Sequence, residues 1–174
     1  MNVFKRWIMI LLLAAPAGLS TAWAMPPGTP APEIESAQWL NSPPLSMESL
    51  HGKVVLVEFW TFACFNCRHV EPYIKQWYRD YGGKGLTVIG VHAPEFSFER
   101  DLSNLRAYIA EHGITYPVAV DNDFTIWHAW HNRAWPTLYL VDRQGIIRHQ
   151  RIGEGDYQTT EETIRRLLQK TSGP

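Results

Sequence analysis

The sequence contains two cysteines, Cys64 and Cys67, separated by Phe65 and Asn66. We expect a buried strand to end just before them and a helix to begin at Cys64. The free N–H groups and partial positive charge of a helix N-terminus stabilise a thiolate. Cys64 is therefore predicted to attack a disulfide, and Cys67, about one turn later, to resolve the mixed disulfide. The alternative is an inert structural disulfide, although a ring this small would constrain the unfolded chain very little.

Glu58, six residues before Cys64, is the second residue whose position suggests chemistry. It stands inside the apolar run 54–60, which is typical of a strand buried on both faces. Burial would raise the pKa of this carboxyl group. A carboxylate at this place would be able to take the proton of Cys67 as that thiol attacks. The alternative is that the strand edge is wet and that Glu58 is an ordinary exposed acid.

Hydrophobic periodicity predicts the elements that would position these residues. A helix is expected from about Cys64 to Tyr81, with Pro72 inside it. The last helix is predicted to open at Thr159 with Glu162 completing a capping box. The other expected elements are strands at 86–91 and 118–120, helices near 102–109 and 124–130, and a hairpin formed by 137–141 and 146–152. Strands that alternate with helices, followed by a hairpin and a helix, predict an α/β sandwich.

Composition restricts the class of protein. The 174 residues suffice for one ordinary domain and a short extra segment. The formal net charge of −1 argues against a nucleic-acid partner. Two cysteines are too few for a multi-disulfide scaffold or a four-cysteine zinc site.

The N-terminus has the layout of a cleavable secretory signal. Two basic residues precede the apolar run 7–15, and Ala22-Trp23-Ala24 matches a small-residue cleavage pattern. We therefore predict a signal peptide at 1–24, a Pro-rich linker at 25–33, and one domain at 34–172 in an oxidising compartment, the periplasm. An uncleaved N-terminal membrane anchor is the alternative.

Several motifs in a fixed order resemble the thioredoxin superfamily over roughly residues 36–170. They are Glu58-Phe59-Trp60, the Cys-x-x-Cys pair, Pro72 and Trp135-Pro136-Thr137. The segments 45–53 and 94–120 are similar to the TlpA/ResA-like periplasmic branch. Within that branch, the runs 59–64, 90–96 and 153–157 resemble the soluble domain of DipZ-type proteins, in which a thioredoxin-like domain is joined to a CcdA/DsbD-like membrane electron transporter.

This resemblance implies a thioredoxin-like three-layer sandwich, a mixed central sheet flanked by helices. It also implies a cis-proline at Pro136 facing the disulfide, although the sequence alone favours a trans bond. Glu58 would be the buried acid of the family. No cofactor would be needed beyond the redox-active disulfide Cys64–Cys67. The implied partners are protein thiol or disulfide substrates and a membrane electron donor of the CcdA/DsbD type.

The resemblance does not fix the direction of electron flow. Thioredoxin has a Trp directly before its first cysteine, whereas Ala63 stands here, and Phe-Asn separates the two cysteines. We favour a periplasmic reductase of protein disulfides and keep a dithiol oxidase as the alternative. Phe65, Trp135 and Glu95 are the candidate substrate-binding residues. For Glu95, an ordinary loop carboxylate is an equal alternative.

Two other functions remain open on sequence grounds. A peroxiredoxin-type peroxidase would fit Thr61, three residues before Cys64, but Val57 stands where those enzymes have Pro. A non-enzymatic Cu(I)-binding protein would hold the metal with its two thiolates. The histidines that would assist the two thiolates are His69, His128 and His131.

Overall fold

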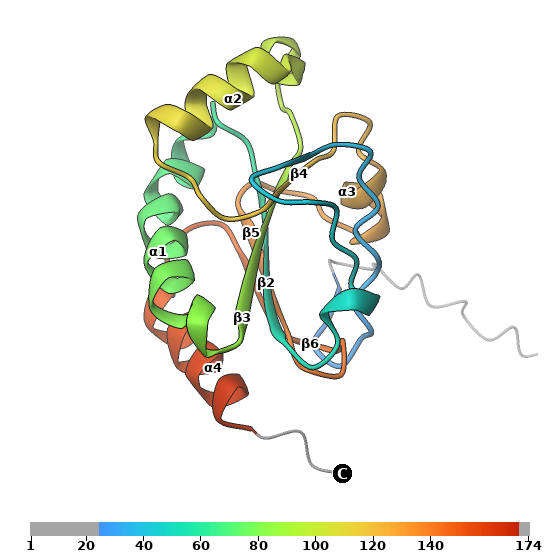
Figure 1. Ribbon diagram of the computed structural model, residues 1–174, viewed down its shortest axis with the longest axis vertical. Coiled ribbons are helices and arrows are strands. Elements are labelled where there is room, and N and C mark those ends of the chain that lie inside the picture. The colour runs from blue at the N-terminus through green and yellow to red at the C-terminus, as the bar shows by residue number, and fades with distance from the viewer. Residues whose placement is uncertain (1–24, 171–174) are drawn as a thin grey trace, which may run out of the picture.

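The computed structural model describes residues 25–170, so the predicted signal peptide lies outside the described residues. Within that range the apolar runs form one six-stranded sheet with the order β1-β4-β3-β2-β5-β6 (Figure 1). The strands are β1 (Trp39–Leu40), β2 (Val54–Trp60), β3 (Leu86–His92), β4 (Val118–Val120), β5 (Thr137–Val141) and β6 (Ile147–Ile152). The α-helices are α1 (Phe65–Tyr81), α2 (Leu102–Glu111), α3 (Thr125–Ala129) and α4 (Tyr157–Gln169).

The sheet is mixed, as the resemblance implies. Strands β2, β3 and β4 run parallel, while β5 is antiparallel to β2, β6 to β5, and β1 to β4. β2 lies between β3 and β5, and all seven of its residues are buried. The strand that carries Glu58 is therefore a central strand and not a wet edge.

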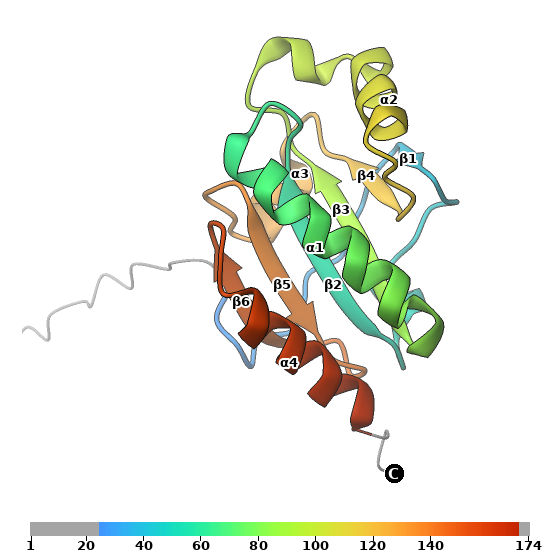
Figure 2. The same cartoon turned by 90° about the vertical axis from the view of Figure 1, so that its left-hand side faces the viewer.

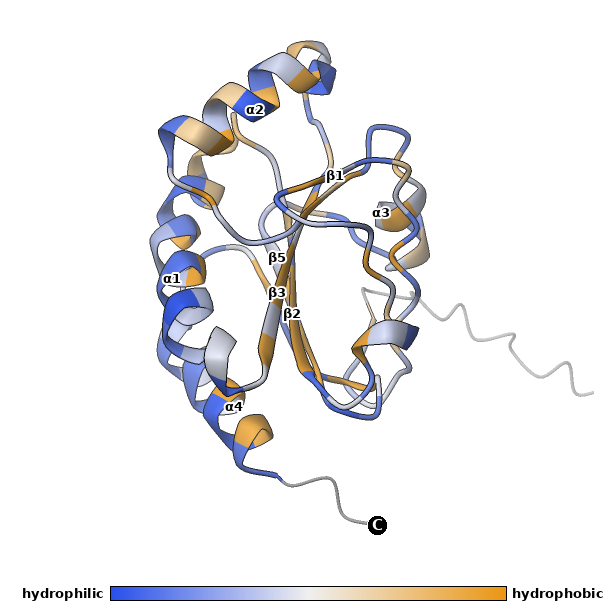
Figure 3. Ribbon diagram, viewed as in Figure 1, coloured by the Kyte–Doolittle hydropathy of each residue, from blue (hydrophilic) through white to orange (hydrophobic). Residues whose placement is uncertain are grey.

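Helices cover both faces of the sheet and complete three layers. α1 and α4 cross one face, and α3 with the N-terminal segment covers the other (Figures 1 and 2). Alternate residues of β2 separate the two cores because successive side chains of a strand point to opposite faces. Val54, Leu56 and Trp60 join the core beneath α1, whereas Val55, Val57 and Phe59 join the other. The apolar colouring in Figure 3 is correspondingly concentrated in the strands between the layers.

The Pro-rich segment at 25–33 is in part attached to the domain. Gly28 N–H donates to the carbonyl of Ile147 and Ala31 N–H to that of Gly145, each at 2.8 Å. Pro30 forms an isolated antiparallel bridge with Ile146. Residues 28–31 thus lie along the β5–β6 hairpin.

The predicted start of the last helix is wrong by two residues. α4 begins at Tyr157, and its N-cap Asp156 has a positive φ of 56° and makes no side-chain capping bond. Thr160 Oγ1 bonds the Asp156 carbonyl at 3.0 Å, so the threonines lie inside the helix. The Tyr157 ring stacks on Tyr73 of α1 at 3.6 Å, a tertiary contact that favours the earlier start.

Candidate active site

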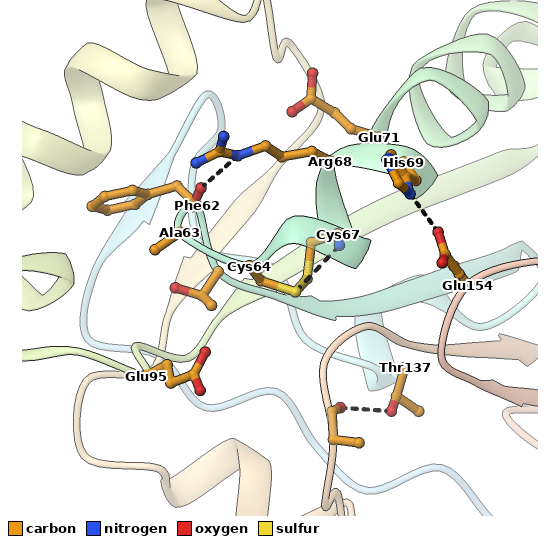
Figure 4. The surroundings of a disulfide bond; sticks show 12 residues. Phe62, Ala63, Cys64, Cys67, Arg68, His69, Glu71, Glu95, Thr137 and Glu154 are labelled. Carbon is orange, nitrogen blue, oxygen red and sulfur yellow. Dashed lines mark hydrogen bonds and ion pairs between the residues drawn. A yellow bond between two sulfur atoms is a disulfide. The ribbon is translucent and has the colours of Figure 1, made fainter.

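The cysteine pair lies where β2 leads into α1 (Figure 4). Cys64 is the N-cap of α1, and its sulfur accepts a hydrogen bond from Cys67 N–H at 3.2 Å. The two residues form a disulfide with a Cα–Cα separation of 5.3 Å. Cys64 is half-buried, whereas Cys67 is only 3% exposed. A partner sulfur can therefore approach Cys64 much more easily than Cys67.

Glu58 lies on the same face of the sheet as Cys67. It alternates with Leu56 and Trp60, which share one core with Cys67, and the period of two directs its side chain to that side. Glu58 is 2% exposed and accepts a hydrogen bond from Tyr116 Oη at 3.4 Å. The interpretation of Glu58 as an exposed acid is therefore wrong.

Burial makes Glu58 a weak acid. Desolvation, reinforced by the nearby negative charge of Glu71, raises its pKa to about 8, although the hydrogen bond from Tyr116 opposes the rise. This pKa lies close to that of an ordinary thiol, about 8.5. A proton can therefore pass between Glu58 and a thiol at little energetic cost.

Glu71 is a second carboxylate near Glu58. It is 7% exposed and accepts hydrogen bonds from Lys75 at 2.7 Å and Tyr108 at 2.8 Å, and His112 Nδ1 lies 3.1 Å away. Partial burial opposes its ionisation, but these hydrogen bonds and positive charges outweigh it and lower its pKa. The i, i+4 pairing with Lys75 is visible in the sequence; the contacts with α2 and the residue after it are not.

Pro136 precedes β5, the neighbour of β2. The Trp135–Pro136 bond is cis, as the resemblance implies and against the expectation from the sequence alone. Pro136 is buried, and its carbonyl accepts a hydrogen bond from Gly153 N–H at 2.8 Å. Trp135 is half-buried, with its ring 4.3 Å from that of Trp127. No hydrogen-bond partner for the buried Trp135 Nε1 exists within residues 25–170.

Phe65 and Glu95 are both exposed beside the disulfide. Phe65 directly follows Cys64 and is 68% exposed, with its ring 4.4 Å from that of His69. His69 Nδ1 lies 2.6 Å from a Glu154 carboxylate oxygen of the β6–α4 loop. Glu95 projects from the loop after β3, and Figure 4 draws it among the residues around the disulfide.

Glu99 is a site residue that the sequence did not indicate. It lies in a short 3-10 helix, Ser97–Arg100, and is only 1% exposed. Its carboxylate accepts hydrogen bonds from Thr61 Oγ1 and Ala63 N–H in the turn before Cys64. Its charged neighbour Arg100 would instead suggest an ordinary exposed loop.

The residues that the structure describes contain no candidate metal site. Between residues 25 and 170, no three His, Cys, Asp or Glu side chains form a group that would hold a metal ion. In the same range, every helix is too short or too polar to cross a bilayer.

Sequence comparison agrees with this picture. Residues 27–150 match the AhpC/TSA family. The chain is 45% identical to the DipZ protein of Mycobacterium bovis over 142 residues, 79% of this chain but 20% of DipZ, so it spans about a fifth of that relative. It is 30% identical to the thiol-disulfide oxidoreductase YkuV of Bacillus subtilis over 143 residues, 82% of this chain and 96% of YkuV.

Comparison of structures gives the same fold. A crystal structure of a thioredoxin-like superfamily protein superimposes with a TM-score of 0.77 at 27% identity, covering 83% of this chain and 99% of the other. Three observations thus indicate the same family of proteins: the motifs at the cysteine pair, the mixed sheet, and the matches in sequence and structure. The chain belongs to the AhpC/TSA family and, within it, to the thioredoxin-like thiol-disulfide oxidoreductases, whose redox group is a cysteine pair.

Proposed function

We propose that this chain is an exported reductase of protein disulfides that works in the periplasm. The observation that carries the proposal is the asymmetry of the cysteine pair. Cys64 is half-exposed at the N-terminus of α1, while Cys67 is buried on the face of the sheet that carries Glu58. This arrangement gives the two sulfurs different roles in one exchange reaction.

In the dithiol form, the Cys64 thiolate attacks one sulfur of a substrate disulfide. A Cys64–substrate disulfide forms, and the other substrate sulfur leaves as a thiolate. The N-terminus of α1 stabilises the attacking thiolate, because its free N–H groups carry partial positive charge. Cys67 N–H already points at the Cys64 sulfur, at 3.2 Å.

Cys67 then attacks Cys64 and releases the second substrate thiol. The ionised fraction of Glu58, about a tenth at pH 7 for a pKa of about 8, takes the Cys67 proton, which finally passes to the substrate thiolate that leaves. Two electrons move from the cysteine pair to the substrate, which is reduced to a dithiol while the chain becomes a disulfide. A pKa of about 8 suits Glu58 to both halves of this transfer.

Pro136, Phe65, Trp135 and Glu95 are proposed to contact the substrate polypeptide. Phe65 offers an apolar surface next to the nucleophile, since 68% of the side chain is exposed. Pro136 and Trp135 directly precede β5, which pairs with β2. An extended segment of a partner would lie against these side chains while its disulfide reaches Cys64.

The predicted signal peptide supports the periplasmic location, and the resemblance to DipZ-type proteins supports a membrane electron donor of the CcdA/DsbD type. Such a donor would return the disulfide to the dithiol form. N-terminal sequencing of the protein from the export compartment should find Met25 as the first residue. A chain that keeps residues 1–24 would favour an N-terminal anchor.

Replacing Cys67 with Ala tests the exchange mechanism. The variant cannot resolve the mixed disulfide, so partners should stay covalently bound to Cys64 and be released by dithiothreitol. Mass spectrometry then identifies them, and Cys64→Ala is the matched control that should capture nothing. If Cys67→Ala captures no protein or small thiol in the export compartment, the exchange mechanism is wrong.

The reduction potential tests the direction. A value of about −270 mV, where thioredoxin lies, indicates a reductase, and one of about −120 mV an oxidase. Turnover of hydrogen peroxide by Cys67→Ala would instead support a peroxidase. Stoichiometric, tight Cu(I) binding by the dithiol form would support a metal carrier.

A further inference from the structure

The Glu99 carboxylate joins two loops beside the cysteine pair. One oxygen accepts hydrogen bonds from Thr61 Oγ1 and, at 2.8 Å, from Ala63 N–H. The other accepts from Glu95 N–H and Phe96 N–H, both at 2.8 Å. A single buried side chain thus ties the turn before the nucleophile to the loop after β3.

The donors around Glu99 favour an anion. Three of its four partners are backbone N–H groups, which can only donate, and the Thr61 hydroxyl donates as well, so each carboxylate oxygen accepts two hydrogen bonds. Burial opposes ionisation, but the hydrogen bonds from Thr61 and from the backbone outweigh it and lower the pKa of Glu99. A glutamine would present an NH₂ group to two of these partners. It would leave Glu95 N–H and Phe96 N–H unpaired in one orientation and Ala63 N–H unpaired in the other, where the Thr61 hydroxyl can accept instead.

The other charged groups near this turn do not cancel the anion. Arg68 of α1 donates from Nε to the Phe62 carbonyl at 3.4 Å, but its side chain is exposed to solvent. His92 Nε2 lies 3.4 Å from Thr61 Oγ1, and burial lowers the pKa of His92 to about 4, so it is neutral near pH 7. Glu95 is exposed and carries the same sign as Glu99.

We propose that Glu99 is a positioning residue for disulfide exchange: it fixes the turn before Cys64 and places a buried negative charge that disfavours the Cys64 thiolate. This inference rests on the proposed function. Ala63 directly precedes Cys64, so chain geometry limits the distance from the anion to the Cys64 sulfur to about 10 Å. At that range a poorly screened charge changes an ionisation equilibrium by roughly tenfold.

The consequence concerns the direction of electron flow. A less stable thiolate makes the dithiol form less stable relative to the disulfide. The dithiol therefore gives up its electrons more readily, and the chain becomes a stronger reductant. Glu99 would in this way oppose the helix N-terminus, which stabilises the same thiolate.

Two variants of Glu99 separate its charge from its packing. Glu99→Gln removes the charge, and Glu99→Asp keeps it on a shorter side chain. The thiolate is measured by the rate of Cys64 alkylation between pH 4 and 9, and the redox balance by equilibration with glutathione. We expect about a three- to tenfold larger thiolate fraction and a similar shift towards the dithiol in Glu99→Gln, but little change in either in Glu99→Asp.

Asp142→Asn is the matched control. Asp142 is also buried, at 8% exposure, and accepts from the backbone N–H groups of Gln144 and Ile146 and from Arg148. It follows β5 at the end away from Pro136, so its replacement should destabilise the fold without changing Cys64. Equal alkylation profiles of Glu99→Gln and Asp142→Asn would overturn the proposal.

The wild-type protein offers a measurement that does not depend on folding of a variant. In the dithiol form, the carboxyl carbon-13 resonance of Glu99 should move over the same pH range in which alkylation reports ionisation of Cys64. A resonance that stays fixed there overturns the inference. If wild-type protein does not exchange with glutathione at all, the proposed function fails, whatever the Glu99 variants show.

Discussion

Replacing Glu58 with Gln should stabilise the protein, and the gain should grow with pH. The pKa of Glu58 is about 8 in the folded protein, against an ordinary value of 4.5. Below pH 4.5 both folded and unfolded chains hold the proton, so the carboxyl group has little effect on stability. Between pH 4.5 and about pH 8 only the folded chain holds the Glu58 proton, so the free energy of unfolding falls by about 1.4 kcal/mol for each pH unit. At pH 7 the loss is about 3 kcal/mol.

The glutamine side chain of this variant cannot ionise and still offers an oxygen to Tyr116. We therefore expect Glu58→Gln to raise the free energy of unfolding by about 3 kcal/mol at pH 7 and by very little at pH 4. Guanidinium unfolding of the disulfide form from pH 4 to 8 measures the difference. Glu111→Gln, which removes the same charge from an exposed position on α2, is the control. A gain that does not change with pH would refute the reasoning.

The same variant should impair function while it stabilises the fold. Without a carboxylate to accept the Cys67 proton, the second step of exchange should slow and the mixed disulfide should accumulate. Rapid acid quench of the reaction with a protein disulfide would trap and quantify that intermediate. An unchanged lifetime of the mixed disulfide would exclude Glu58 from the proton transfer.

Two further substitutions test the surroundings of the site. A Cβ at Gly90 would lie 2.7 Å from Trp60 Nε1, so Gly90→Ala should cost about 1–3 kcal/mol in thermal unfolding. Gly83→Ala, where nothing lies within 4 Å, should cost much less, and equal losses would contradict the packing argument. Phe65→Ala should lower kcat/KM for a protein disulfide by about fivefold, through lost apolar contact, and leave turnover of glutathione disulfide unchanged. Equal losses for both substrates would show that Phe65 does not bind the polypeptide.

The sequence alone predicted the chemistry of the cysteine pair and most of the framework around it. The apolar run of β2 and the periodicity of α1 are local patterns, so they placed Cys64 at a helix N-terminus and Cys67 one turn further on. A charged residue inside an apolar run likewise marked Glu58 as a candidate buried acid. These features can be predicted because each depends on residues that are close together in the chain.

The tertiary structure decided which distant residues surround that centre. Glu99 reaches Thr61 across 38 positions, and Glu71 reaches Tyr108 across 37. Neither contact leaves a periodic pattern in the sequence, because each depends on tertiary packing. The loop that follows β3 packs beside the start of α1, and so does helix α2. The cis geometry before Pro136 followed from the family resemblance, since local preference alone favours a trans bond. Hydrogen bonds between separate segments, and the burial of the groups that make them, determine where these groups lie. Local propensity does not encode such contacts.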